Sequence, residues 1–349
     1  MRAPISVFTI ALFASAPALS AQSTPAQTTP AWPTKGWPVA TPQAVGLNPK
    51  VLDSLDAEIT SGRYGYVDRM LVIRRGRVAF DKAYTHDYAR IYADSARVTG
   101  ALNPHDETGP YNYYNPWWHP YYRKEGLHTL QSVTKTITSV VIGAAVARNE
   151  FPSIDTPVLS FFDVAKVANV DERKRRMTIS GASELLAYIF RKATKTDIEE
   201  YAARHLFAPL GIPRWYWKRT PHGLVDTEGG LYLEARDLAK IWYLFLRNGS
   251  WDGRQVVTAD WVKSSVAPAV AVAPAPNAAR YGLKWWLYPD PRGADRYIWG
   301  GSGFGGQIPM AFPGDDMIVV FNAWNILPGR PSLPRAQVTA RLVNAIVAP

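Results

Sequence analysis

The spacing of hydrophobic and polar positions predicts where helices and strands lie in this chain. After Asn48–Pro49, a typical helix start, apolar residues recur three and four positions apart over 52–59. Two strand-like runs, 71–74 and 77–80, flank Arg75–Gly76 and predict a hairpin. The N-terminal part of the domain therefore combines one helix with one hairpin.

Helical patterns dominate the middle of the chain and strand patterns return near its end. The predicted helices are 132–146, 183–193, 196–211 (with Thr196 and Glu199 as a capping box), 235–247 and 335–347. The predicted late strands are 281–288, 297–300, 307–312 and 317–321. This order predicts an α+β fold: an antiparallel sheet with the terminal helices packed on it. A helical part, about 132–265, is inserted between its N-terminal and C-terminal strands.

The first 38 residues have a different composition from the rest. Residues 1–21 resemble a secretory signal peptide, with Arg2, a short apolar stretch and the small residues Ala18, Ser20 and Ala21. Residues 22–38 are rich in Ser, Thr, Ala and Pro and predict a flexible lead-in. We therefore expect an exported protein, periplasmic or extracellular, whose domain spans 39–349.

Composition argues against several classes of protein. The chain has no cysteine, so disulfides and thiolate metal sites are ruled out, and its histidines lack zinc-ligand spacing. The formal net charge is +10, but the densest basic run, Arg173–Arg176, has no interleaved aromatic residues and is better interpreted as a solvated loop than as a nucleic-acid site. No apolar run beyond the leader could span a membrane. We expect no cofactor, no metal, no nucleic-acid partner and no stable membrane insertion.

Ser132 and Lys135 carry the clearest chemical signal. A serine and a lysine three apart lie on one face of a helix, so the Lys135 amine can reach the Ser132 hydroxyl. The apolar run 136–146 is expected to bury the helix and shield the lysine from water, which favours the neutral amine that can act as a base. An ordinary surface Ser and Lys would give the same pattern.

A glycine-rich segment near the C-terminus contains G-x-G-x-x-G at Gly301, Gly303 and Gly306. A dinucleotide site would need a helix next, but the strand-like run 308–312 follows. We interpret the segment as an edge strand that lets a substrate lie against the backbone and aims an N–H group at an oxyanion. A bulged hairpin turn is the alternative.

Together, the leader, the Ser-x-x-Lys pair and the glycine-rich segment resemble the serine β-lactamase and penicillin-recognising superfamily, from about Trp37 onward. The resemblance is strongest to its secreted β-lactamase-related hydrolases, which include esterases, peptidases and enzymes like 6-aminohexanoate-dimer hydrolase. The supporting stretches are 70–76, 128–132, 207–212, 228–231 with 235–238, and 303–307.

The resemblance implies the roles of individual residues. Ser132 would be the acylated nucleophile and Lys135 its base. The backbone N–H groups of Ser132 and of Gly303, or of Phe304 if the register slips by one, would form the oxyanion hole. The substrate would be a small-molecule ester or amide, hydrolysed through an acyl-enzyme.

Two departures from the family pattern stand out. The late motif usually carries a Lys or His, but here its place falls on Gly300–Ser302, so no cation awaits a substrate carboxylate. The second motif, Tyr-x-Asn or Tyr-x-Ser, is missing, and Thr178 stands at the tyrosine position of a shortened helical region. Tyr188 and Tyr232 are candidate substitutes.

Three interpretations follow from the missing tyrosine. The first is a serine hydrolase with reduced activity, and the second is a catalytically silent protein that binds cell-wall or glycan fragments. The third is a poorly folding product of a damaged gene. The aromatic stretch 111–122 either lines the substrate cleft or packs over the sheet.

Overall fold

A computed structural model describes residues 32–103, 109–181, 183–274, 278–293 and 295–347. Its helices are α1 Pro49–Thr60, α2 Tyr88–Ile91, α3 Thr134–Val146, α4 Glu172–Arg176, α5 Leu186–Thr194, α6 Ile198–Ala202, α7 Ala208–Leu210, α8 Ala235–Leu246, α9 Ala259–Ser265 and α10 Arg335–Asn344. Its strands are β1 Val67–Arg74, β2 Arg77–Ala83, β3 His128–Thr129, β4 Tyr216–Trp217, β5 Leu231–Leu233, β6 Ser250–Trp251, β7 Arg254–Gln255, β8 Val270–Ala271, β9 Arg280–Tyr281, β10 Trp286–Pro289, β11 Tyr297–Gly300, β12 Ile308–Phe312 and β13 Met317–Ala323.

The main sheet joins the two ends of the chain. In the described residues it has eight strands in the order β2-β1-β13-β12-β11-β10-β9-β8, and neighbouring strands pair antiparallel. The long central pair β1–β13 therefore connects the N-terminal hairpin to the C-terminal strands. Smaller sheets, β3-β5-β4 and β6-β7, lie in the helical part.

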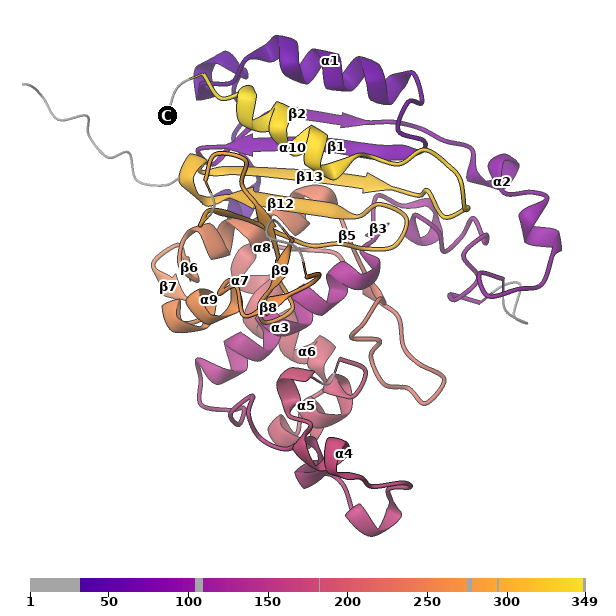
Figure 1. Cartoon of the computed structure of the whole chain (residues 1–349), viewed down its shortest axis with the longest axis vertical. Coiled ribbons are helices and arrows are strands. Elements are labelled where there is room, and N and C mark those ends of the chain that lie inside the picture. The colour runs from indigo at the N-terminus through magenta and orange to yellow at the C-terminus, as the bar shows by residue number, and fades with distance from the viewer. Residues whose placement is uncertain (1–31, 104–108, 182, 275–277, 294, 348–349) are drawn as a thin grey trace, which may run out of the picture. The chain divides into compact units, whose positions relative to one another are not determined.

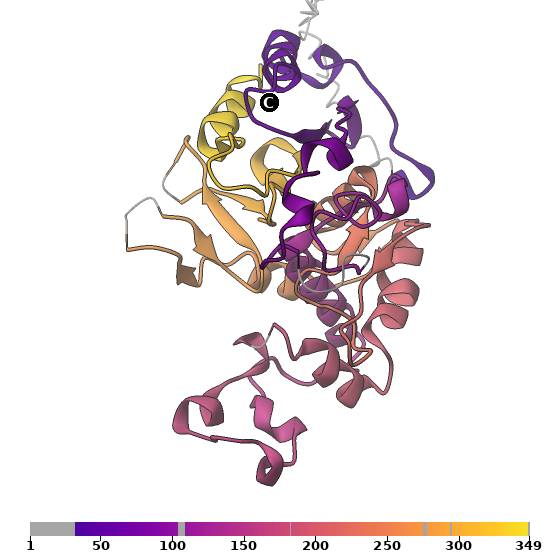
Figure 2. The same ribbon diagram turned by 90° about the vertical axis from the view of Figure 1, so that its right-hand side faces the viewer.

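The alternation of side chains along β1 separates two hydrophobic cores. Met70 and Val72 pack with residues of α1 and α10, whereas Leu71 and Ile73 pack with residues of α3 and α8. Figure 2 shows the terminal helices and the helical part on opposite sides of the sheet. In Figure 1, α5 and α4 lie farther from the sheet than α3 does. The predicted α+β arrangement is confirmed.

The predicted helices are confirmed with shifted boundaries. Asn48 caps α1, since its side chain accepts a hydrogen bond from the Lys50 N–H at 3.1 Å. The predicted cap at Thr196 is wrong, because Asp197 accepts from the Glu199 N–H at 2.9 Å and takes the extended conformation of a cap. The predicted helix 196–211 is a run of α6, one π-helical turn and α7, which ends at Gly211 in the left-handed conformation.

The described part of the lead-in is packed rather than flexible. Trp32 lies 5.3 Å from Trp251 between ring centroids, and the Trp37 indole donates to the Arg236 carbonyl at 2.9 Å. The apolar area of two indoles explains why this Pro-rich segment is held on the domain. The predicted signal peptide 1–21 and the rest of the lead-in, 22–31, lie outside the described residues.

The glycine-rich segment is a hairpin connection rather than an edge strand. β11 lies between β10 and β12, and the edges of the sheet are β2 and β8. Residues 301–307 connect β11 to β12, with Gly305 and Gly306 at positive φ. Glycine is favoured at such angles because it has no Cβ. The alternative interpretation, a bulged hairpin turn, is therefore the correct one.

Within the described residues, no helix has both the length and the hydropathy needed to cross a membrane.

Candidate active site

The nucleophile candidate lies where a short strand turns into a buried helix. The Leu130 N–H donates to the Leu231 carbonyl at 2.9 Å, which extends the β3–β5 pairing. Gln131 then takes a left-handed conformation with φ of 47°, and a single 3-10 turn leads into α3. Ser132 is exposed in this first turn, where helix N–H groups have no partner within the helix. The sharp turn therefore presents both the Ser132 hydroxyl and its N–H.

Ser132 and Lys135 are in contact. Lys135 Nζ donates to Ser132 Oγ at 3.0 Å and to the Glu228 carbonyl oxygen at 3.2 Å. Glu228 Oε1 also lies 3.2 Å from the same Nζ, so three acceptors surround the amine. The shielding of the lysine expected from the apolar helix is partial, because the Lys135 side chain is 22% exposed and ion-paired. Most of the other residues of α3 are buried.

Three threonines of α3 hold the neighbouring segments in place. Thr134 Oγ1 accepts from the Leu231 N–H at 3.2 Å, and Thr138 Oγ1 donates to the Thr227 carbonyl at 3.1 Å. Thr136 Oγ1 donates to the Lys284 carbonyl at 2.8 Å. Because each hydroxyl satisfies a backbone group from another part of the chain, α3 fixes the 227–231 segment and the turn before β10 around Lys135.

A second lysine–serine contact lies beside the first. Lys284 Nζ donates to Ser183 Oγ at 2.8 Å. Burial and the positive charge of Lys135 lower the pKa of Lys284, whereas the charge of Glu228 raises it. These interactions mean that the two amines and the carboxylate share one local electrostatic environment.

The glycine turn lies against the nucleophile segment. A Cβ on Gly301 would lie 3.0 Å from Val133 Cγ2, and one on Gly303 would lie 2.4 Å from the Leu130 carbonyl oxygen. Glycine is therefore required for this close approach at residue 303. The Gly303 N–H donates to the Gln307 carbonyl at 2.9 Å and is not free to bind an oxyanion. Among the described residues, the Phe304 N–H has no hydrogen-bond acceptor, which leaves it available as a donor.

Neither candidate tyrosine reaches the Ser132–Lys135 pair. Tyr188 stacks on Phe162, and the buried Tyr232 hydroxyl donates to the Trp118 carbonyl at 2.6 Å. No tyrosine hydroxyl of the described residues is hydrogen-bonded to Ser132 or Lys135. The structure therefore offers no direct substitute for the missing family tyrosine.

The aromatic stretch 111–122 divides between a groove and the core. Tyr111 lines a groove of about 460 Å³, which is also lined by Glu184, Thr220, Pro221, Val225, Asp226, Thr227 and Glu228. His119 is instead buried, with its ring stacked 5.0 Å from that of Trp324 and 4.8 Å from that of Tyr113. The packing interpretation holds for His119, whereas the cleft interpretation stays a prediction for Tyr111. Since Glu228 contacts Lys135, the groove opens beside the candidate dyad.

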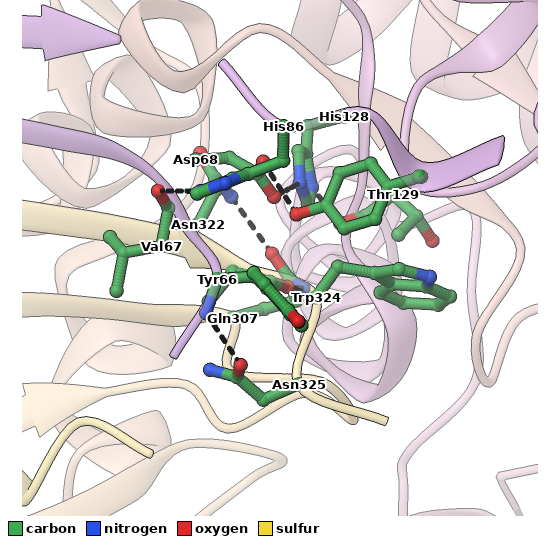
Figure 3. A network of polar contacts seen from close by, with 12 residues as sticks. Tyr66, Val67, Asp68, His86, His128, Thr129, Gln307, Asn322, Trp324 and Asn325 are labelled. Carbon is green, nitrogen blue, oxygen red and sulfur yellow. Dashed lines mark hydrogen bonds and ion pairs between the residues drawn. The ribbon is translucent and has the colours of Figure 1, made fainter. Parts of the chain in front are cut away.

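A polar network ties the nucleophile strand to the sheet (Figure 3). The His128 ring contacts the Asp68 carboxylate through Nε2 at 3.0 Å and the Thr129 carbonyl through Nδ1 at 2.9 Å. Across the sheet, the Asn322 amide donates to Gln307 Oε1 at 3.0 Å. His128 lies in β3, the strand that leads to Ser132, and Gln307 is the last residue of the glycine turn before β12. The network therefore couples both halves of the candidate site to β1 and β13.

Sequence reasoning missed Glu228, Lys284 and Ser183 as members of the site. No local pattern marks Lys284, whose left-handed backbone conformation (φ of 66°) is known only from the structure. The described residues contain no group of three His, Asp or Glu side chains placed to hold a metal ion.

Comparisons with known proteins concern the fold. The family model for beta-lactamase matches residues 180–343, a range that begins after Ser132 and Lys135. No curated protein matches the chain. Among solved structures, a proposed 6-aminohexanoate-dimer hydrolase from Bacillus anthracis is 14% identical, with a TM-score of 0.61 over 89% of this chain and 87% of that chain. A beta-lactamase from Mycobacterium bovis is 15% identical, with a TM-score of 0.54 over 85% of this chain and all of that chain (100%).

At these identities the structural likeness concerns the fold. An eight-stranded antiparallel sheet with a helical part beside it defines the class of beta-lactamase and transpeptidase folds. The family model for beta-lactamase matches residues 180–343, less than half of the chain, so the chain is similar to the beta-lactamase family over that range.

Proposed function

We propose that this protein hydrolyses a small-molecule ester or amide through an acyl-enzyme on Ser132. The observation that carries the proposal is the 3.0 Å contact between Lys135 Nζ and the exposed Ser132 Oγ at the start of a buried helix. A nucleophile and a base within hydrogen-bond distance, next to a groove, are the minimum machinery for acyl transfer.

In the first step, the neutral amine of Lys135 takes the proton of the Ser132 hydroxyl. Ser132 Oγ forms a bond to the substrate carbonyl carbon, and the N–H groups of Ser132 and Phe304 donate to the oxyanion. The bond to the leaving group then breaks, and the proton held by Lys135 goes to that group. Water repeats the sequence on the acyl-enzyme, releases the acid and restores Ser132.

We propose that turnover is slow. The family tyrosine is absent, and no described tyrosine hydroxyl contacts the dyad. Help from one general acid–base residue is worth about 10²- to 10⁴-fold in rate. The same observation supports a second candidate, a silent scaffold that binds cell-wall or glycan fragments without cleaving them.

Intact-mass measurement after treatment with a fluorophosphonate probe tests the proposal. We expect a single adduct in the wild type and in Ser264→Ala, a control on an exposed serine of α9, and none in Ser132→Ala. Hydrolysis of short-chain p-nitrophenyl esters should be slow in the wild type and absent in Ser132→Ala.

Two outcomes would contradict parts of this proposal. A cooperatively melting protein that never forms the adduct would favour the silent binding scaffold. Rapid ester turnover that depends on Ser132 would show that the tyrosine is dispensable and that slow turnover is the wrong expectation.

A further inference from the structure

Phe304 is an exposed aromatic residue on the glycine turn. Its side chain is large and apolar, and the residue is 44% exposed. The backbone around it is nevertheless held in place. A Cβ on Gly305 would lie 2.7 Å from Trp324 Cε3, and the Phe304 carbonyl accepts from Gln307 Nε2 at 3.4 Å. The turn therefore presents an aromatic ring to solvent from a fixed backbone.

The Phe304 ring is supported by a group of parallel aromatic rings. It meets Tyr113 edge-to-face, with ring centroids 5.8 Å apart, and Trp324 in the same way at 6.2 Å. The rings of Tyr113, His119 and Trp324 are parallel to within 2° of one another. Such arrangements are favourable for aromatic rings and orient the Phe304 side chain. Since Tyr113 is only partly buried, Phe304 and Tyr113 together form what we call the aromatic surface.

The aromatic surface adjoins the nucleophile turn through two separate contacts. The Tyr113 hydroxyl lies 3.5 Å from Gln131 Oε1, and Gln131 directly precedes Ser132. The glycine turn approaches the same segment so closely that a Cβ on Gly303 would lie 2.4 Å from the Leu130 carbonyl oxygen. Both rings of the surface are therefore carried by segments that touch the residues just before the nucleophile.

A substrate bound in the proposed way must lie beside Phe304. The Phe304 N–H is available as a donor, and an oxyanion-hole donor lies about 3 Å from the oxygen that it binds. The groups attached to the same carbonyl carbon then lie within reach of the Phe304 ring. The leaving group takes its proton from Lys135, so it faces Lys135 and Glu228. The acyl group is the part of the substrate that is left to cover the aromatic surface.

We propose that Phe304 and Tyr113 determine the acyl-group specificity of the site, which prefers arylalkyl acyl groups such as phenylacetyl over acetyl. An aromatic acyl group removes apolar area of both rings from water and packs against their faces or edges, whereas an acetyl group is too small to cover them. The inference deepens the proposed function and rests on it, because the aromatic surface has this role only if Ser132 is acylated.

Two esters with the same leaving group test the proposal: p-nitrophenyl phenylacetate and p-nitrophenyl acetate. The quantity to measure is the ratio of their kcat/KM values, which reports the steps up to acylation and not the slow release of the acid. We expect the wild type to prefer the phenylacetate and Phe304→Ala to lower the ratio about tenfold, through the loss of one aromatic contact and its buried area. Comparison of the two proteins cancels the intrinsic reactivities of the esters, and the variant keeps its backbone N–H.

Three further variants make the comparison specific. Phe304→Tyr keeps the ring and should retain the wild-type ratio. Tyr113→Leu removes the other ring of the aromatic surface and should lower the ratio, as Phe304→Ala does. Trp117→Ala is the matched control, because Trp117 is an aromatic residue that is 56% exposed and lines a different groove. It should change neither the ratio nor the rate on either ester.

Failure of the inference is distinguishable from failure of the proposed function. A wild type without the preference, or a Phe304→Ala ratio equal to that of the wild type, would overturn the aromatic surface while hydrolysis still depends on Ser132. A fluorophosphonate with only small alkoxy groups has nothing to place on this surface, so its labelling reports on Ser132 alone. Absence of labelling in the wild type, or labelling that survives in Ser132→Ala, would overturn the hydrolase itself.

Discussion

Lys218 is a buried amine whose environment opposes its charge. The residue is 1% exposed, and Nζ donates a hydrogen bond to the Pro110 carbonyl oxygen at 3.3 Å. The rings of Tyr111, Tyr113 and Tyr232 lie around it, with centroids 4.6, 5.8 and 5.9 Å from Nζ. Burial lowers the pKa of Lys218 from 10.5 to about 8. The folded protein therefore binds this proton less tightly than the unfolded chain does.

The sign of the stability effect follows from that difference. Below pH 8 the amine is charged in both states, and the folded state carries the full penalty of burying it. Between pH 8 and 10.5 only the unfolded chain keeps the proton, so the penalty is relieved as pH rises. At about 1.4 kcal/mol for each unit of pKa difference, the full penalty is about 3 kcal/mol, of which about 2 kcal/mol is relieved between about pH 7 and 9.5.

Comparison of Lys218→Met with the wild type isolates this contribution. We expect the free energy of unfolding of the variant, minus that of the wild type, to fall by about 2 kcal/mol between about pH 7 and 9.5. Urea titrations followed by tryptophan fluorescence give both values, and the subtraction cancels other titrating groups. A difference that is constant over this range would refute the reasoning, whatever the variant does to packing at a single pH.

Two further predictions concern the network and the oxyanion site. His128→Ala should lower the free energy of unfolding by about 1–3 kcal/mol, because it removes one of the two side-chain hydrogen bonds of the buried Asp68 carboxylate and leaves the one from Tyr88; a loss below about 0.5 kcal/mol in urea titrations would contradict this. Phe304→Pro removes one backbone N–H and should slow fluorophosphonate labelling by about 10²- to 10³-fold, whereas Phe304→Ala keeps the N–H and should label at nearly the wild-type rate. Equal labelling by the two variants, each with a wild-type melting curve, would exclude the Phe304 N–H from the oxyanion hole.

Local sequence patterns predicted much of the fold because the relevant forces act between near neighbours. The cap at Asn48 and the turn at Arg75–Gly76 depend on a few adjacent residues, and both occur as expected. The structure of the glycine segment 300–306 was harder to predict, because its composition suits both an edge strand and a hairpin turn. Only the pairing of β11 with both neighbours decides between them.

The site itself was predictable only in part. Ser132 and Lys135 meet because helical geometry brings positions three apart together. Glu228 and Lys284 reach the same place from distant parts of the chain, held by threonine hydroxyls whose partners no local pattern reveals. The shielding of Lys135 is partial for the same reason, since the long-range arrangement that places Glu228 beside it also leaves the side chain 22% exposed.

The missing tyrosine bears on how fast this site should turn over. A missing general acid–base residue is worth about 10²- to 10⁴-fold. The Ser132–Lys135 pair alone is therefore expected to lack the rate that such a residue would provide. A site built this way should acylate readily with an activated probe, whose leaving group needs little protonation, and turn over slowly on an ordinary ester or amide.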